Sequence, residues 1–203
     1  MKKILLLCTI LMVSVMTTAC INNLAIKELN NKAESYLDKG ETETAICRLK
    51  SSLDLDNEIY QTHYNLAVAY NTIGNYEGAI EEANKVLELK PELSDAYYII
   101  AVAKEAIAYK TIEDNTNSTA PSVDAISEFN SKAQESIDTY NKYLVKVPNA
   151  QDSEKINGKI DELNKKIKEL TEIQEKATNS SDLKKKLMQY KTTEKQLDYE
   201  DLK

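Results

Sequence analysis

Residues 60–93 read YQTHYNLAVAYNTIGNYEGAIEEANKVLELKPEL and contain two amphipathic segments. On each segment, small and apolar side chains recur at the three- and four-residue spacings that place them on one face of a helix. These residues are Leu66, Ala67 and Tyr70 on the first segment and Ala79, Ala83 and Val86 on the second. Gly74-Asn75 separates the segments and Pro91 follows the second. Because glycine favours turns and proline stops helices, the stretch predicts a helical hairpin.

The pattern of this hairpin repeats along the chain with a period of 34 residues. The residues 34 positions before Ala67, Tyr70, Gly74 and Ala79 are Ala33, Tyr36, Gly40 and Ala45, so four identities fall in register without a gap. In the other direction Ala101 keeps the register, but Lys104 and Ala108 stand where the tyrosine and the glycine would be. The sequence therefore predicts two regular hairpins and a third that begins in register and then departs from it.

Residues 60–93 resemble a tetratricopeptide repeat (TPR), whose pattern of Leu-Gly-x-x-Tyr, then Ala, Phe and Pro has a 34-residue period. His63 stands where the family usually has Trp, and Ala67 where it has Gly. The resemblance implies an all-α fold, a TPR-type α-solenoid of about three helix pairs followed by a C-terminal helical extension. The low content of glycine and proline, four and three residues of 203, agrees with an all-α chain.

The chain divides into four parts at this level. We expect a signal peptide at 1–19, a lipidated N-terminus with a short tether at 20–25, a solenoid at 26–148 and charged helices at 149–203. The expected repeats are 26–59, 60–93 and 94–148. The third contains a polar insert at 111–123, TIEDNTNSTAPSV, which is either functional or merely flexible.

The first twenty residues have the features of an export signal. Lys2-Lys3 precedes an apolar run from Ile4 to about Met16, and Thr17-Thr18-Ala19 leads to Cys20. A cysteine directly after such a segment resembles the lipid-attachment site of bacterial lipoproteins, although Thr17 departs from the aliphatic residue that the family favours. The resemblance implies acylation of Cys20 and anchoring to the extracytoplasmic face of a bacterial membrane. Ordinary secretion, with a free thiol at Cys20, is the alternative.

The charge distribution bears on the class of partner. The net charge is −7, and cleavage before Cys20 would remove two lysines and leave −9. Residues 151–203 hold 12 basic and 12 acidic side chains, so the negative charge lies on residues 20–150. This acidic body argues against nucleic acid and against electrostatic adhesion to anionic lipid, and it would tolerate or attract a basic partner.

Cleavage of the signal peptide would remove Cys8, and lipidation would occupy the thiol of Cys20. Cys47 would then be the single free cysteine of the mature chain. An intramolecular disulfide is then impossible, and stability must come from helix packing. We interpret Cys47 as a small packing residue, with an intermolecular disulfide as the alternative.

The first helix of each TPR pair lines the concave side of the solenoid. By family position the predicted groove residues are Asn30, Glu34, Gln61, Tyr64, Val68, Asn71, Tyr98, Val102 and Glu105. Tyr64 and Tyr98 are 34 residues apart and are predicted to form a ladder that contacts a peptide or helix, or else to pack against the next helix. His63 is expected to lie between helices rather than to bind a metal.

One TPR subfamily clamps the C-terminal carboxylate of chaperones with two Asn and three basic residues. The matching positions here are Asn30, Glu34, Asn65, Asp95 and Ile99. Only Asn65 agrees, and two positions carry an acid where a carboxylate must be attracted. This departure excludes the chaperone tails as partners.

An apolar stripe of Ile156, Ile160, Leu163, Ile167 and Leu170 follows Pro148, with steps of four and three residues. Thr178–Asp182 is interpreted as a turn before a second, shorter helix. The stripe either caps the open end of the solenoid or pairs with a partner, and self-association through 152–177 belongs to this alternative.

The sequence is compatible with two classes of function and does not support a third. The first is a membrane-anchored scaffold or assembly factor in the bacterial envelope, whose groove binds a peptide or helix of another envelope or membrane protein. The second is an accessory lipoprotein for a small ligand or transported solute, with a pocket among Tyr64, Tyr98 and the insert. An enzyme is not predicted, because the chain has one histidine and no nucleophile elbow, glycine-rich phosphate loop or metal-ligand spacing. No cofactor and no metal site is expected.

Overall fold

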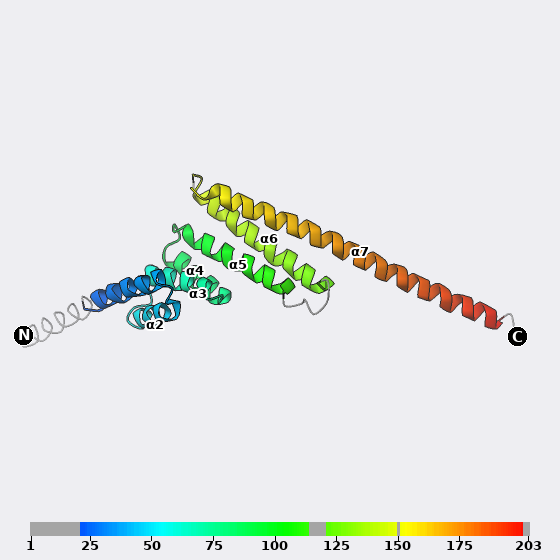
Figure 1. Cartoon of the computed structure of the whole chain (residues 1–203), viewed down its shortest axis with the longest axis horizontal. Coiled ribbons are helices and arrows are strands. Elements are labelled where there is room, and N and C mark those ends of the chain that lie inside the picture. The colour runs from blue at the N-terminus through cyan, green and yellow to red at the C-terminus, as the bar shows by residue number, and fades with distance from the viewer. Residues whose placement is uncertain (1–20, 114–120, 150, 201–203) are drawn as a thin grey trace, which may run out of the picture.

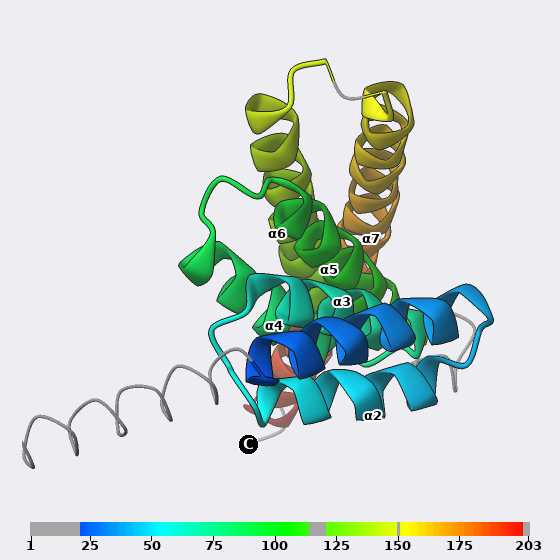
Figure 2. The same ribbon diagram turned by 90° about the vertical axis from the view of Figure 1, so that its left-hand side faces the viewer.

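The chain folds as an all-helical array whose helices pack in sequential pairs, as the repeat pattern predicts (Figures 1 and 2). The computed structural model describes residues 21–113, 121–149 and 151–200, with side chains up to residue 180. A first helix covers residues 21–38. The helices that follow it are α2 (Thr42–Leu53), α3 (Tyr60–Thr72), α4 (Tyr76–Leu89), α5 (Asp95–Glu113), α6 (Val123–Lys146) and α7 (Ser153–Glu200). None of the helices in this described part is both long and apolar enough to cross a membrane.

Glycines at equivalent positions make the turns of the first two helix pairs. Gly40 and Gly74, 34 residues apart, both have φ of 76°, in the left-handed region that side chains with a Cβ avoid. After the second turn, the Asn75 side chain accepts a hydrogen bond of 3.3 Å from the backbone N–H of Gly78 and so caps α4. The predicted helical hairpin at residues 60–93 therefore has the predicted turn.

Alanine-rich faces allow the helices of the first two pairs to approach closely. One buried cluster joins the first helix, α2 and α3, and consists of Ala33, Ala45, Ile46, Leu49, Leu66 and Ala69. A second joins α3, α4 and α5, and consists of Ala67, Ala83, Val86, Ala96, Ile99 and Ile100. Each cluster belongs to neighbouring helices only, which is the packing expected of a solenoid.

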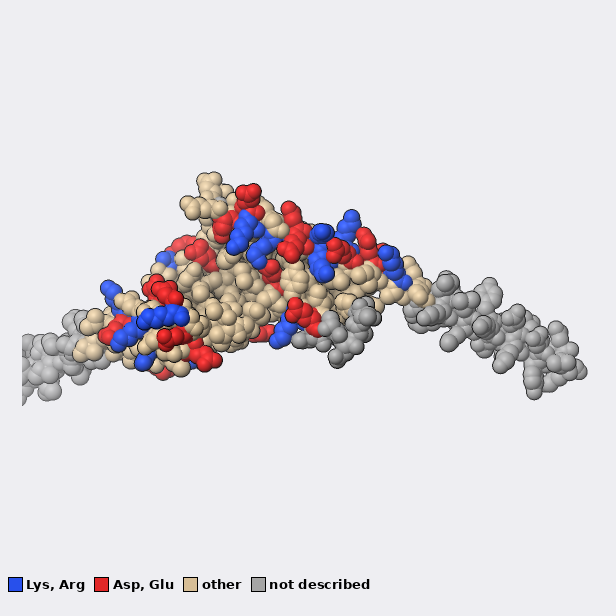
Figure 3. Space-filling model, viewed as in Figure 1, with Lys and Arg blue, Asp and Glu red and all other residues tan. Residues whose placement is uncertain are grey.

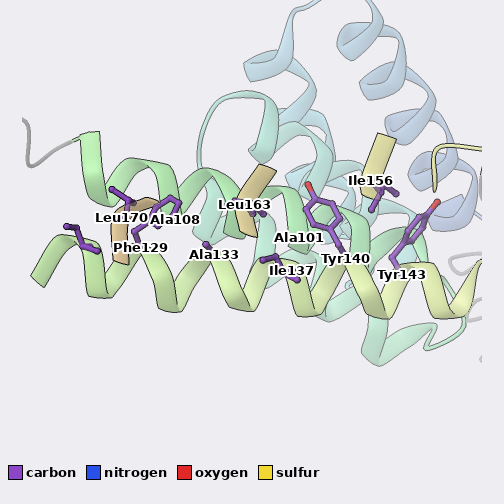
Figure 4. Close-up of a cluster of buried hydrophobic side chains, with 11 residues drawn as sticks. Ala101, Ala108, Phe129, Ala133, Ile137, Tyr140, Tyr143, Ile156, Leu163 and Leu170 are labelled. Carbon is purple, nitrogen blue, oxygen red and sulfur yellow. The ribbon is translucent and has the colours of Figure 1, made fainter. Parts of the chain in front are cut away.

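The third pair is longer and encloses the largest buried cluster (Figure 4). Phe129 and Tyr140 of α6 lie fully buried, and the Tyr109 ring of α5 meets Phe129 edge-on with ring centroids 5.5 Å apart. Ile156, Leu163 and Leu170 of α7 complete this cluster. The C-terminal stripe thus caps the array, and these three side chains are buried within the molecule. Self-association through 152–177, the alternative, is not tested by these contacts and stays a prediction.

The C-terminal region is one helix, so the predicted turn at Thr178–Asp182 is wrong. Residues 178–182 contain no glycine or proline, and the Thr178 hydroxyl donates to the carbonyl of Gln174 one turn earlier, at 2.9 Å. The helix therefore continues through the polar stretch. Beyond Gln174, which reaches Ser127 near the start of α6, α7 extends past the rest of the array (Figure 1). Acidic and basic side chains are intermixed over the visible part of α7 (Figure 3).

The insert predicted at 111–123 is shorter than expected. Residues 111–113 belong to α5, where the Thr111 hydroxyl donates to the Ala108 carbonyl at 2.7 Å and Ile112 packs against the large cluster. At the other end, the Ser122 side chain caps α6 by accepting from the N–H of Ala125 at 3.1 Å. Residues 114–120 lie outside the described part of the chain.

Two further expectations need correction near the N-terminus. Residues 21–25, predicted as part of a short tether, are helical. Cys47 is exposed on α2 and does not fill the core, so its interpretation as a packing residue is wrong. The signal peptide at 1–19 and the lipid-attachment residue Cys20 lie outside the described residues and stay predictions.

The turn glycine offers a direct test of the fold. Because residue 74 has a positive φ, Gly74→Ala should lower the free energy of unfolding by about 1–2 kcal/mol. The matched control is Gly158→Ala, which lies in the interior of α7 with open space around its Cβ position and should raise the free energy of unfolding by about 0.5–1 kcal/mol. Urea unfolding followed by circular dichroism measures both changes. Equal effects of the two substitutions would contradict the assigned turn.

The capping role of α7 can be tested at Leu163. Its side chain is 0% exposed, so Leu163→Ala should reduce the free energy of unfolding by about 2–5 kcal/mol. Ile173→Ala, at a side chain that is 42% exposed, should cost less than about 1 kcal/mol. A near-neutral Leu163→Ala in the same unfolding experiment would show that α7 does not seal the array.

Candidate functional site

One groove of about 680 Å³ lies between the first helix, α3 and the start of α5. Its lining residues are Asn23, Ile26, Lys27, Asn30, Asn31, Glu34, Ile59, Tyr60, Gln61, Tyr64, Asn65, Leu93 and Asp95. Four of the nine predicted groove residues are among them, namely Asn30, Glu34, Gln61 and Tyr64. Partner binding at these residues stays a prediction.

The repeat period explains how the groove is assembled. Ile59 and Leu93, which are 34 residues apart, come from the loops before α3 and α5 and contribute apolar wall. Lys27, Gln61 and Asp95 also occupy one repeat position, in the first helix of each of three successive pairs. Sequence reasoning missed Ile59 and Leu93 because it considered the first helix of each pair and not the loop that precedes it. The 34-residue spacing of these two apolar residues was the signal that would have found them.

Asn30 ties three helices together at the base of the groove. Its amide nitrogen lies 3.0 Å from the Ser52 hydroxyl of α2 and 2.9 Å from the Thr62 hydroxyl of α3. Asn65 donates to the Asn30 side-chain oxygen at 3.4 Å. Ser52 and Thr62 are both fully buried. Asn30 is therefore part of the framework that fixes the groove wall.

Aromatic residues form much of the remaining wall. The Lys90 ammonium lies over the Tyr60 ring at 4.3 Å from its centroid and donates a hydrogen bond of 3.1 Å to the Tyr60 hydroxyl, which fixes this ring. Tyr64 is half-buried on α3. Burial, and then the negative charge of Asp95, raise the pKa of Tyr64 above its usual value. Its hydroxyl therefore stays protonated at neutral pH and can both donate and accept a hydrogen bond.

His63 holds the loop that carries Ile59. His63 is 6% exposed. Its Nδ1 lies 2.6 Å from a carboxylate oxygen of Glu82 on α4, and its Nε2 donates to the Asn57 carbonyl at 2.8 Å. The ring lies between helices, as predicted. Burial alone would lower the pKa of His63, but the hydrogen bonds to Glu82 and Asn57 outweigh burial and raise the pKa above its usual value.

The other five predicted groove residues do not line this groove. Val68 and Val102 pack against buried clusters, and the Asn71 amide donates to the Ile99 carbonyl at 3.2 Å. The Tyr98 ring packs against the rings of Tyr140 and Tyr143, at centroid distances of 6.0 and 5.7 Å. For Tyr98 the structure shows the second of the two alternatives, packing against the next helix, and Tyr98 does not join Tyr64 in lining this groove.

Glu105 is held by the two C-terminal helices. The Tyr140 hydroxyl of α6 donates to one carboxylate oxygen at 2.6 Å, and the Lys159 ammonium of α7 lies 2.9 and 2.8 Å from the two oxygens. Both partners of this carboxylate come from outside the first helices of the pairs. The C-terminal cap thus fills the part of the predicted groove around Glu105, and the groove is limited to the N-terminal half of the array.

Within the part of the chain that the structure describes, no three histidine, cysteine, aspartate or glutamate side chains are grouped so that they could hold a metal ion.

Residues 60–93 match the family model described as tetratricopeptide repeat, and no match was found among curated proteins. One similar solved structure is the second TPR domain of human RPAP3 in complex with the HSP70 peptide SGPTIEEVD (15% identity, TM-score 0.54, 70% of this chain and 98% of that chain). Another is the first TPR of Spaghetti (RPAP3) bound to the HSP90 peptide SRMEEVD, with 18% identity and a TM-score of 0.54 over 70% of this chain and 92% of that chain. A third is the TPR2B domain of yeast Sti1 in a complex with pHsp70, with 16% identity and a TM-score of 0.54 over 70% of this chain and 98% of that chain.

A further similar structure, a Thermobaculum terrenum O-GlcNAc transferase mutant, is matched over 65% of this chain but only 21% of its own, with 14% identity and a TM-score of 0.50. At these identities the similarity shows the fold alone. The fold is TPR-like, and the family resemblance of the middle repeat is confirmed by the family model.

The His63 contacts predict a pH-dependent stability. Because the folded-state pKa of His63 is raised, its contribution is fully present below the unfolded-state pKa near 6.5 and is lost as the pH rises through the folded-state pKa. Between pH 6 and pH 8.5, the melting temperature of the native chain should fall relative to that of His63→Gln by about 2–4 °C. Differential scanning calorimetry of both proteins measures this. In Glu82→Gln the effect should shrink, and a pH-independent difference would contradict the assignment.

Proposed function

We propose that this protein is a membrane-anchored TPR lipoprotein of the bacterial cell envelope that holds a peptide or helical segment of another envelope or membrane protein in its N-terminal groove. The observation that carries the proposal is the groove itself. It combines apolar side chains from two loops, two tyrosines and unpaired polar side chains on a framework fixed by buried hydrogen bonds.

The similar TPR domains support binding of a segment rather than of a whole folded surface, because two of them hold short peptides. Both peptides end in Glu-Glu-Val-Asp. In this chain such an acidic end would meet Glu34 and Asp95, which line the groove. The partner segment therefore differs in charge from those peptides.

The membrane anchor is supported by the sequence of the N-terminal twenty residues. Lipidation of Cys20 would place the first helix directly after the anchor, because residues 21–38 are already helical. The groove is lined by this helix, so it would lie close to the membrane surface. This position suits a partner that is itself embedded in the membrane or attached to it.

The small-ligand alternative has less support. It requires a pocket shared by Tyr64, Tyr98 and the insert, but Tyr98 packs against α6 and does not line the groove that contains Tyr64. Within the described residues, the end of α5 and the start of α6 that border the insert contribute nothing to that groove. A scaffold remains the better interpretation.

Photo-crosslinking in cells tests the proposal. A photoreactive residue at Gln61, which is exposed and lines the groove, should give a discrete adduct with one envelope protein. The same residue at Val145, which is 78% exposed on α6, is the control and should give none. The adduct should decline severalfold in Cys20→Ala, because loss of the anchor lowers the local concentration of the protein near its partner.

The outcomes separate the two parts of the proposal. An adduct at Gln61 that is unchanged in Cys20→Ala would support the groove and reject the anchor. Adducts at Val145 alone would move the interaction away from the groove. Absence of any protein adduct at Gln61 would overturn the scaffold function.

A further inference from the structure

We infer that the groove selects a partner segment carrying a lysine or arginine side chain, which is seated against Glu34 and Asp95. This inference rests on the proposed function, because it names the chemistry of the segment that the same groove would hold. It follows from which charges line the groove, which of them are already paired and what surrounds them.

Two carboxylates face the groove without a partner. Glu34 comes from the end of the first helix and Asp95 from the first turn of α5, and both line the same cavity. Among the described residues neither side chain makes a hydrogen bond or an ion pair. The contrast is Glu105, a carboxylate of the neighbouring surface, which is satisfied by Tyr140 and Lys159. The acidic groups of the groove are therefore the ones left available to a ligand.

The groove has too little positive charge of its own to neutralise them. Lys27 is the one cation among the lining residues, which are all described. It lies seven residues before Glu34 on the same helix, or about 10 Å along the helix axis. At that distance an exposed ammonium does not neutralise Glu34, and among the described residues Lys27 makes no ion pair with Asp95 either. The part of the groove near Glu34 and Asp95 therefore stays negative.

The surroundings strengthen this negative field. Ile59 and Leu93 place apolar surface in the groove, and low-dielectric walls concentrate the field of nearby charges. The same field acts on Tyr64, where the charge of Asp95 adds to burial in raising the pKa of the hydroxyl. A cation that entered here would gain two carboxylates, and the oxygens of Tyr64 and Gln61 could accept further hydrogen bonds from it.

Apolar residues beside the cation complete the expected recognition pattern. A segment whose basic side chain reaches Glu34 and Asp95 would lie across Ile59, Tyr60 and Leu93. The occupant is thus a short basic-and-apolar segment of a partner protein. An acidic or purely apolar segment would leave the two carboxylates desolvated without a partner, which costs binding free energy.

Selection from a random nonapeptide phage library tests the inference without knowledge of the partner. The bait is the full chain in mild detergent, captured through a C-terminal tag. We expect selected peptides to be enriched in lysine or arginine at one position, with apolar residues nearby. Glu34→Gln combined with Asp95→Asn should remove the enrichment and weaken a selected peptide about tenfold or more in fluorescence anisotropy.

A charge-matched control separates a local effect from a change in net charge. Asp161→Asn combined with Glu175→Gln removes two exposed carboxylates of α7, which lie outside the groove, and should leave the affinity unchanged. A charge swap, Glu34→Lys with Asp95→Lys, should turn the selection towards aspartate and glutamate. Equal weakening by the control pair would mean that the attraction is merely long-range, and this would overturn the inference.

The remaining outcomes distinguish this inference from the proposed function. Peptides selected without a basic position, but competing with one another for the groove, would overturn the inference and leave the scaffold function intact. If no peptide is selected at all, both fail. Self-association of the chain that Glu34→Gln with Asp95→Asn abolishes would identify a second copy as the occupant in place of a partner protein, and would also overturn the inference.

Discussion

The structure depends on close stacking of helices that cannot bury their apolar faces alone. The residues that make this stacking possible are small: Ala67 on α3 and Ala83 on α4 are fully buried, and each lets a neighbouring backbone approach. None of the three buried clusters in the described part of the chain spans all the helices, so each pair relies on the pair beside it. The groove is a by-product of the same arrangement, since stacking the pairs in register brings the start of each first helix to one surface.

An array of this kind has an open apolar end, and the cap that closes it also determines where a ligand can bind. α7 buries Ile156, Leu163 and Leu170 against the last pair. Its Lys159 then reaches Glu105, a residue that would otherwise belong to the concave surface. The cap thereby satisfies the charge at its own end of the array. Among the residues that line the groove, the carboxylates Glu34 and Asp95 have no such partner. The C-terminal half of the molecule thus stabilises the array, and the N-terminal half contains the carboxylates that we propose select the ligand.

Much of this could be predicted from the sequence because it follows from a period. The two turn glycines, the alanine faces and four groove residues were fixed by repeat position, and local geometry is the same at each repeat. Some predictions failed within the regular repeats, at Cys47, Val68 and Asn71, and others failed where the period ends. Tyr98 and Glu105 occupy groove positions by number, but their surroundings depend on α6 and α7, whose lengths no repeat dictates. Thr178–Asp182 looked like a turn because its residues favour caps, yet with no glycine or proline nothing prevents a helix from passing through.

α7 also sets a length. Its 48 residues correspond to about 72 Å of helix, and its C-terminal part projects away from the first helix along the long axis of the molecule (Figure 1). If the protein is held at its first helix, the length of α7 determines how far its C-terminal end lies from the point of attachment. A segment bound in the groove would then lie near the point of attachment, and the C-terminal end of α7 would lie several nanometres away from it. A gap between two layers of that width could be bridged by this one small chain, with no second domain required.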